Sequence, residues 1–324
     1  MVSFGRCAAL FALVSCLFTS HATLAQTYPL RPITIVIGYT PGAVSDLAAR
    51  TIADGLHQAW GQPAIVDNRP GSGGNIGAAL VARAPADGYT LMVGTDATMA
   101  SNVHLYKYVG FDPVKDFAPV AYAGANIICL AVNAELPIKS VADVIAYAKK
   151  NPGKLNYGSS GTGSPHHLAG ELLHQKTGID IAHIPYKGGG AAVNDLIGGH
   201  IGMAFLSLSA AVPHMNTGKI RIIALVEKTR YAAMPDIPTI GETVPGFEMS
   251  SWIGVFAPAG TPADIVTKLN DGIAKVLTAE GVKAKLANLG LVVVAGKPGE
   301  LADVVKEGLR VRGELVKAAG IQPE

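Results

Sequence analysis

The chain has few charged and few aromatic residues, and each shortage excludes a class of function. Charged side chains make up 15% and aromatic side chains 6% of the 324 residues, and the formal net charge is only +2. A nucleic-acid-binding protein needs a clustered basic surface, and no such cluster is evident in the sequence. We therefore expect no nucleic-acid partner.

Cysteine is almost absent from the part of the chain that should fold. Cys7 and Cys16 lie near the N-terminus, within a segment that we expect to be removed, and Cys129 stands alone in the apolar run 127–130. One thiol cannot form an intrachain disulfide, so stability must come from the core. Cys129 is therefore interpreted as a small buried apolar side chain.

Apolar runs long enough to span a bilayer, which takes about 20 residues, are also lacking. The shorter run 7–18 follows a positive charge at Arg6 and precedes small residues around Ala25, a pattern typical of a secretory signal peptide. We expect residues 1–26 to be removed, by cleavage after Ala25 or one residue later, and the mature protein to be periplasmic. Residues 13–16 also resemble a lipobox, so a lipid-anchored form is the less favoured alternative.

What the chain does contain is an alternation of short β-rich runs with amphipathic stretches, which predicts an α/β fold. Its first part has the order strand, helix, strand, helix, strand, which is typical of a parallel sheet with helices on both faces. The predicted strands are 33–37, 64–66 and 90–93, and the predicted helices are 46–60 and 76–84.

Two domains are predicted from the course of the chain. The long apolar run 120–132 predicts a strand that passes from a first domain into a second, and a strand at 220–226 is expected to return. Two such crossings form a hinge about which the domains can close. We expect domain 1 to comprise residues 27–124 and 228–324, and domain 2 to comprise residues 125–227. The helices expected to pack on domain 1 near the C-terminus are 262–277 and 299–318.

Two loops have the composition of an anion-binding site. Loops 39–46 and 158–165 each follow a predicted strand, carry Gly, Ser and Thr, and lead into a predicted helix. Free N–H groups at a helix N-terminus, together with hydroxyl groups, can hold a carboxylate without Arg or Lys. Ser164 is a good N-cap, and Pro165 suits the first helical position. The same residues also cap ordinary α/β turns, so it is the pairing of the two loops that favours binding.

Nucleotide and metal motifs are incomplete. The second loop has P-loop spacing, but Ser164 and Pro165 stand where Lys and Ser or Thr are required. The glycines in 71–77 are one residue off the dinucleotide fingerprint. His167, Glu171 and His174 could hold a metal, although their spacing is more typical of a solvated helix face. We expect no cofactor and no metal.

A serine hydrolase is the alternative to a binding protein. The second loop could supply Ser160 or Ser164 as the nucleophile, but Thr162 stands where a G-x-S-x-G elbow requires its last glycine. No Ser-His-acid combination is evident, though such partners can lie far apart in sequence. We therefore expect a protein that binds a ligand and performs no chemistry.

Seven segments resemble, in order and spacing, the Bug family of bacterial solute receptors, the binding components of tripartite tricarboxylate transporters. The segments are 41–46, 67–77, 84–91, 156–164, 184–188, 194–199 and 257–262. The resemblance implies a two-lobed, type-II-like periplasmic binding protein fold, with a ligand cleft between lobes joined by two crossover strands. It also implies a small carboxylate ligand, membrane transporter subunits as partners, and a monomer. A receptor that feeds a sensor kinase would share these features and stays open.

The resemblance further implies that main-chain N–H groups of the first loop hold the carboxylate and that the second loop acts across the cleft. For Asp46 the favoured role is bonding to the start of its own helix. The expected ligand-binding residues are Tyr39, Thr40, Pro41, Gly42, Ala43, Ser45, Asp46, Asn75, Thr95, Thr98, Ser159, Ser160, Gly161, Thr162, Gly163, Ser164, Lys187 and Gly188.

Two departures from the family pattern concern the ligand. Ala43 replaces a usual second glycine of the first loop, and Gly202 and Leu206 stand where acidic or amide residues are common. Leu206, with Phe205 nearby, predicts a more apolar distal pocket. This pattern favours a dicarboxylate or an aromatic carboxylate over an amino acid.

Overall fold

The computed structural model describes residues 28–42, 44–186, 188–247, 249, 251–288, 290–318 and 320–323. The predicted signal peptide, Ala43 and Lys187 therefore lie outside the described residues. Within the described ranges, no helix has both the length and the apolar character that crossing a membrane requires.

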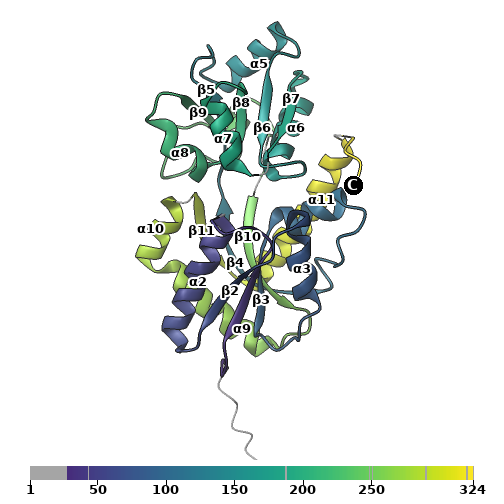
Figure 1. Cartoon of the computed structure of the whole chain (residues 1–324), viewed down its shortest axis with the longest axis vertical. Coiled ribbons are helices and arrows are strands. Elements are labelled where there is room, and N and C mark those ends of the chain that lie inside the picture. The colour runs from purple at the N-terminus through teal and green to yellow at the C-terminus, as the bar shows by residue number, and fades with distance from the viewer. Residues whose placement is uncertain are drawn as a thin grey trace, which may run out of the picture.

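Two β-sheets in the described residues form the centres of two lobes, stacked along the long axis of the molecule (Figure 1). Lobe 1 contains the sheet with strand order β11-β4-β10-β3-β1-β2, and lobe 2 contains the sheet with order β7-β6-β8-β5-β9. Helices pack on both sheets, so the predicted two-lobed α/β fold is confirmed.

The strands of lobe 1 are β1 (Ile33–Ile37), β2 (Ala64–Asn68), β3 (Thr90–Thr95), β4 (Phe117–Asn126), β10 (Ser251–Pro258) and β11 (Leu291–Gly296). Those of lobe 2 are β5 (Ile128–Asn133), β6 (Asn156–Ser159), β7 (Ala182–Pro185), β8 (Met203–Ser207) and β9 (Ile220–Leu225). The α-helices are α2 (Val44–Trp60), α3 (Asn75–Ala82), α4 (Asn102–Leu105), α5 (Val141–Lys150), α6 (Pro165–Thr177), α7 (Gly189–Ile197), α8 (Leu208–Met215), α9 (Ala263–Thr278), α10 (Glu280–Asn288) and α11 (Pro298–Ala318). Short helical turns are η2 (Ser72–Gly74), η3 (Ala97–Ser101) and η4 (Ile240–Glu242).

The sheets are mixed, whereas the sequence predicted a parallel sheet. Strands β2, β1 and β3 are parallel as expected, but β10 lies antiparallel between β3 and β4. In lobe 2, β5 is antiparallel to both β8 and β9. Every residue of β10 is buried, so its sequence has no apolar–polar alternation, and its neighbours come from distant parts of the chain.

The apolar run 120–132 forms two strands instead of one. Strand β4 ends at Asn126 in lobe 1, and β5 begins at Ile128 in lobe 2. The predicted return strand, β9, lies wholly in lobe 2, and the chain returns to lobe 1 between Val226 and Ser251. The lobes are thus joined by two crossings, while the exact domain boundaries stay a prediction.

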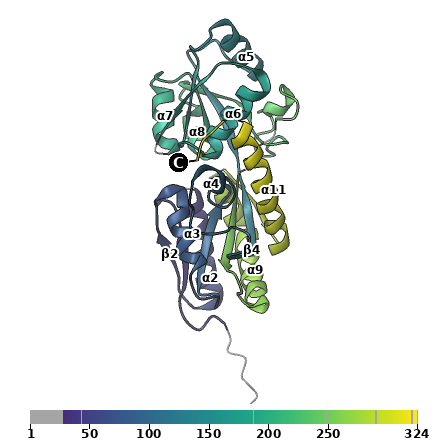
Figure 2. The ribbon, with the colours of Figure 1, turned by 90° about the vertical axis from the view of Figure 1, so that its right-hand side faces the viewer.

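Helix α11 contacts both lobes (Figure 2). Leu301 and Val305 near its start pack into a core cluster of lobe 1, and Leu315 and Val316 near its end join the main core of lobe 2. A helix of 21 residues is about 30 Å long, which is enough to span this junction. The prediction that the C-terminal helices pack on domain 1 is therefore correct for α9 and only partly correct for α11.

A buried ion pair fixes α11 to lobe 1. Arg312 Nη2 lies 3.0 Å from Asp96 Oδ2, and the two side chains are 4% and 1% exposed. Asp96 also accepts hydrogen bonds from Ser251 Oγ and from the N–H groups of Ala97 and Trp252. Burial raises the pKa of Asp96, and the positive charge of Arg312 opposes that effect. The pair therefore joins the end of β3, the start of β10 and α11.

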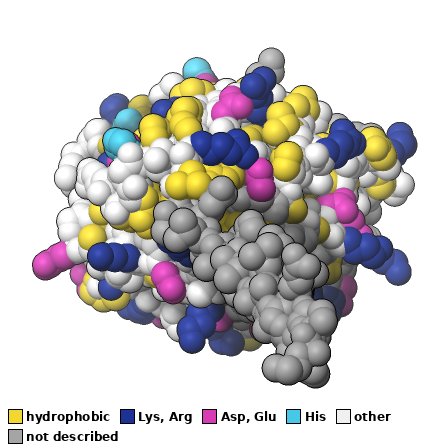
Figure 3. Space-filling model, turned by 90° about the horizontal axis from the view of Figure 1, so that it is seen from below, with side chains coloured by type: hydrophobic (Ala, Val, Ile, Leu, Met, Phe, Trp, Pro, Cys, Tyr) yellow, Lys and Arg dark blue, Asp and Glu magenta, His cyan; other side chains and the backbone are white. Residues whose placement is uncertain are grey.

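The outer end of lobe 1 carries charges of both signs. On the face seen in Figure 3, Lys and Arg side chains lie among Asp and Glu side chains and apolar atoms. This mixture is unlike the clustered basic surface that binds nucleic acid.

Replacing Arg312 with Met should lower the free energy of unfolding by about 3–5 kcal/mol, because Asp96 would stay buried without its counter-charge. The double variant Arg312→Met/Asp96→Asn should recover much of this loss, since it removes both charges. Urea denaturation of the three proteins tests this. Equal stability of the single and double variants would contradict the role of the ion pair.

Candidate ligand-binding site

A cavity of about 640 Å³ lies between the two lobes and is lined by residues of both. This volume falls in the range of small-molecule sites, about 300–1,000 Å³. Its walls come from the loops that precede α2, α6, α7 and α8, and from segments beside the two crossings.

The loop between β1 and α2 forms the wall on the side of lobe 1. Of the predicted residues, Tyr39, Thr40, Gly42 and Ser45 line the cavity, and Pro41 does not. Helix α2 begins at the end of this loop, so the positive end of its dipole lies at the cavity wall.

Asp46 lies behind this loop and does not line the cavity. Its carboxylate is buried and accepts hydrogen bonds from Gly42 N–H and Asn68 Nδ2 at 2.9 Å and from Arg50 Nε at 3.0 Å. Burial alone would raise the pKa of Asp46, but these three hydrogen bonds outweigh burial and hold the pKa below its usual value. The side chain thus anchors the loop to the start of its own helix.

A polar cluster around Tyr39 supports the adjoining wall. The Tyr39 hydroxyl lies 3.0 Å from both Thr95 Oγ1 and Thr98 Oγ1, and it donates to the Gly73 carbonyl at 3.1 Å. Tyr39, Thr95 and Gly73 line the cavity, whereas Thr98 is completely buried behind them. Asn75 is buried as well and does not line the cavity. The predicted residues Thr98 and Asn75 therefore support the wall from behind.

The loop between β6 and α6 forms the wall on the side of lobe 2. Its lining residues are Ser160, Thr162, Gly163 and Ser164, followed by the first residues of α6. Ser164 Oγ accepts the N–H of His167 at 3.2 Å, which confirms the predicted N-cap. This wall therefore also presents a helix N-terminus to the cavity.

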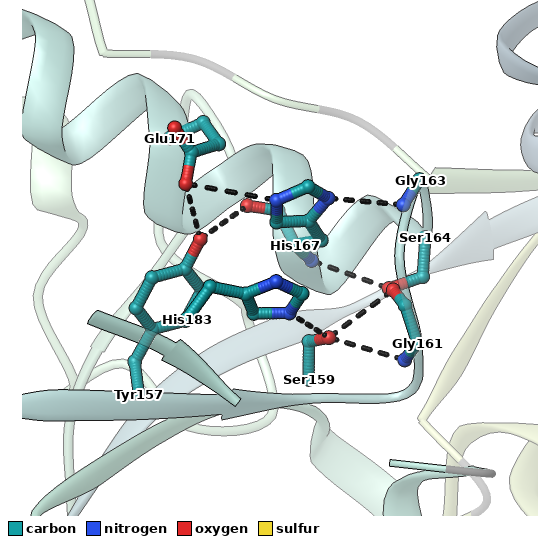
Figure 4. Close-up of polar contacts among 8 residues, drawn as sticks. All are labelled: Tyr157, Ser159, Gly161, Gly163, Ser164, His167, Glu171 and His183. Atoms are coloured by element: carbon teal, nitrogen blue, oxygen red, sulfur yellow. Dashed lines mark hydrogen bonds and ion pairs between the residues drawn. The ribbon is translucent and has the colours of Figure 1, made fainter. Parts of the chain in front are cut away.

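Two stacked histidines hold the second loop from behind (Figure 4). His183 Nε2 lies 2.7 Å from Ser159 Oγ, which accepts the N–H of Gly161 at 3.1 Å. His167 Nδ1 accepts the N–H of Gly163 at 2.9 Å, and its ring stacks on that of His183 with 3.9 Å between centroids. Ser159 and Gly161 belong to this support and do not line the cavity.

The residues considered for a metal site are engaged in contacts within the protein. Glu171 Oε1 accepts the Tyr157 hydroxyl at 2.6 Å and lies 3.6 Å from His167 Nε2. His174 Nδ1 lies 2.6 Å from the Ile179 carbonyl. Across the described ranges, no group of three or more His, Cys, Asp or Glu side chains is placed to hold a metal ion.

His166 is a lining residue that the sequence analysis missed. Its Nδ1 lies 2.6 Å from Ser160 Oγ, and its Nε2 lies 3.4 Å from Ser207 Oγ. Burial lowers the pKa of His166 to about 4, so the ring is neutral at physiological pH. A catalytic triad would place a carboxylate at the second ring nitrogen, and here that nitrogen faces a serine. No periodic pattern in the sequence connects positions 160 and 166, because the loop brings them together.

The remaining lining residues come from segments far apart in the chain: the ends of β3, β4 and β8, the starts of α2, α6, α7, α8 and β10, the turn η2, and the two ends of α4. Gly188 was predicted to lie here. Those that were not among the expected ligand-binding residues are Val44, Leu47, Gly73, Asp96, Ala97, Asn102, Tyr106, Asn126, Pro165, Gly189, Gly190, Ser207, Ser209, Ala210, Ser251, Trp252 and Ile253.

The predicted apolar distal pocket is wrong, because Gly202, Phe205 and Leu206 do not line the cavity. Phe205 and Leu206 are fully buried in two different core clusters, as expected for successive residues that point to opposite faces of β8. The chain first reaches the cavity at Ser207, where β8 ends. Because Leu206 is buried in the core, it cannot provide the apolar contact that an aromatic ligand was expected to make.

The cavity wall is suited to an anion even though it presents no free cation in the part of the chain that the structure describes. Helices α2, α6, α7 and α8 all begin at the cavity. Among the described lining residues, Asp96 is the one with a charged side chain, and its charge is paired with that of Arg312. Backbone N–H groups and hydroxyls would therefore hold a bound carboxylate.

The chain is similar in sequence and in structure to known proteins over most of its length. The sequence model of one protein family, the tripartite tricarboxylate transporter family receptor, matches residues 48–321 of the chain. A UPF0065 protein from the tcbD-tcbE intergenic region of Pseudomonas sp. (strain P51) is 36% identical over 89% of this chain and 87% of its own length.

Two solved structures from Rhodopseudomonas palustris are similar over nearly the whole chain. Rpa4515 with adipate is 39% identical, with a TM-score of 0.84, over 92% of this chain and 100% of its own. MatC with bound malate is 32% identical, with a TM-score of 0.79, over 89% of this chain and 100% of its own.

Replacing Asp46 with Ala should lower both stability and ligand affinity, because three donors lose their acceptor and the loop loosens. We expect a loss of about 1–3 kcal/mol in the free energy of unfolding at neutral pH. Since the folded-state pKa is depressed, the contribution of Asp46 is present above the unfolded value of 3.8 and is lost as the pH falls through the folded value. Urea denaturation and calorimetric titration measure the two effects. Loss of affinity at unchanged stability would indicate a direct ligand contact instead.

His166 should stay neutral between pH 8 and pH 5, because burial lowers its pKa to about 4. In an NMR titration of the ligand-free protein, its imidazole signal, assigned by comparison with His166→Gln, should show no transition in this range. A transition near 6.5, the ordinary histidine value, would mean that the ring is solvated and can carry a charge at the cavity wall.

Proposed function

Because the chain belongs to the family of tripartite tricarboxylate transporter receptors, we propose that it captures a small dicarboxylate and delivers it to a membrane transporter of that type. The family is one of substrate-binding receptors, so the chain is a receptor and not an enzyme. The pairing of Ser160 with His166 accordingly belongs to a binding wall.

The meeting of helices α2, α6, α7 and α8 at one cavity is the observation that carries this proposal. One of these N-termini comes from lobe 1 and three come from lobe 2, so positive dipole ends face the cavity from opposite sides. A ligand with a carboxylate at each end can satisfy N–H groups of both lobes at once. Two related proteins were solved with dicarboxylates, adipate and malate.

The two crossings between the lobes support closure of the cavity around a ligand. Lobes joined by two crossings can rotate about them and enclose a ligand. The closed form would then present a surface shared by both lobes to the transporter subunits. The proposal places the mature protein in the periplasm as a monomer, after removal of the predicted signal peptide.

A thermal-shift screen of residues 27–324, after unfolding and refolding to remove carried ligand, tests the proposed function. The panel holds mono-, di- and tricarboxylates, aromatic acids, amino acids and sugars. A ligand at 100 times its dissociation constant adds about 2.7 kcal/mol of stability, which gives a clear shift. We expect the largest shifts from dicarboxylates of four to six carbons. A folded protein that shifts with none of them contradicts the proposal.

A pair of glycine variants provides the matched control. Gly190 and Gly281 are each the second residue of a helix, and an added Cβ meets nothing within 4 Å at either position. Gly190 lines the cavity and Gly281 does not. Asp suits the first turn of a helix, so both variants should fold. Gly190→Asp should weaken dicarboxylate binding at least about tenfold by repulsion, while Gly281→Asp should bind normally.

A further inference from the structure

A series of polar side chains crosses from lobe 1 to lobe 2 along the wall of the cavity, beside the crossings. In order of contact, its members are Arg312, Asp96, Ser251, Asn126, Ser207, His166 and Ser160. All of them except Arg312 line the cavity.

Asn126 is the member whose hydrogen bonds are incomplete. It is 9% exposed and stands at the end of β4, two positions before β5 begins. Its Nδ2 lies 3.3 Å from Ser207 Oγ and 3.5 Å from Ser251 Oγ, and its Oδ1 is buried without a hydrogen-bond partner among the described residues. A buried amide oxygen in a native protein normally has a partner, so the site calls for a donor from outside the chain.

Asp96 determines which end of this amide is free. Its carboxyl group is surrounded by donors, Arg312, Ser251 and two backbone N–H groups, so it acts as an acceptor. The Ser251 hydroxyl proton is therefore directed at Asp96, at 2.9 Å, and its oxygen is left to accept the N–H of Asn126. The Ser207 hydroxyl can pair with either end of the amide, as donor or acceptor, but turning the amide over would place Oδ1 against the oxygen of Ser251, so the Ser251 contact favours Oδ1 as the free end.

We infer that Asn126 is a specificity-determining residue, whose Oδ1 accepts a hydrogen bond from a hydroxyl or amino group on the carbon chain of the ligand. The inference rests on the proposed function, because the carbon chain of the ligand passes this wall only if the two ligand carboxylates bind the helix N-termini of the two lobes. The hydrogen bonds that hold the amide, at 3.3 and 3.5 Å, are long and therefore weak, so they permit the amide to reorient when a ligand binds. An unsubstituted chain leaves the oxygen without a partner.

Calorimetric titration of ligand-free protein with succinate, malate and aspartate tests the inference. These four-carbon dicarboxylates differ in carrying hydrogen, hydroxyl or ammonium on one carbon. Wild type should bind malate or aspartate about tenfold more tightly than succinate, and the tighter of the two identifies the donor. Adipate and 2-hydroxyadipate provide the same comparison for a longer chain.

Three variants separate the role of the acceptor from general effects on folding. Asn126→Leu keeps the size of the side chain but removes the acceptor, so malate and aspartate should lose their advantage over succinate and the preference should fall to about one. Asn126→Asp keeps an acceptor, so the preference should remain although added charge weakens every dicarboxylate. Asn133→Leu removes a buried asparagine outside the cavity, and should leave the preference unchanged even if the melting temperature falls.

The outcomes distinguish this inference from the proposed function. Equal affinity of wild type for succinate and for its substituted forms would overturn the inference, and so would a preference that persists in Asn126→Leu. Binding of no dicarboxylate by the folded wild type would instead overturn the proposed function. If Asn126→Leu does not fold, a wild-type ratio of about one still overturns the inference, and so does loss of the preference in Asn126→Asp.

Discussion

The buried ion pair between Asp96 and Arg312 is the interaction on which the junction of the two lobes depends. It ties the C-terminal helix to the end of β3 and the start of β10, close to both crossings. Neither charge could remain buried alone, because desolvation of a single ion costs several kcal/mol. The pair also directs the Ser251 hydroxyl, and through it the amide of Asn126, so its influence reaches the cavity wall.

The two loops that line the cavity are held in the same way. Side chains behind each loop form hydrogen bonds to it and so fix its conformation. Asp46 fixes the first loop through Gly42, and the stacked His167 and His183 fix the second through Gly163 and Ser159. A loop held in this way loses little conformational freedom when it binds, which favours affinity. The front of each loop presents hydroxyl groups and a helix N-terminus to the cavity.

Recognition by dipoles and neutral groups has a consequence for the range of ligands. A helix N-terminus attracts any carboxylate with modest strength, so charge alone discriminates poorly between acids of similar length. Discrimination then depends on shape and on single uncharged contacts, such as those of His166 and Asn126, whose positions are set by neighbours in both lobes.

The sequence by itself determined the strands and helices of the first parallel unit, the Ser164 N-cap, and the two loops, 39–46 and 158–165, that contribute to the cavity wall, because each depends on neighbouring residues. The structure differs from the prediction made from the sequence where contacts join distant segments. Strand β10 is buried throughout and carries no alternation, and the place where β8 meets the cavity, Ser207 instead of Leu206, depends on where the strand ends. Only the tertiary structure decided that His166 faces Ser160 and that Asn126 lies between two serines from opposite lobes, since these contacts exist only after both sheets and α11 have packed.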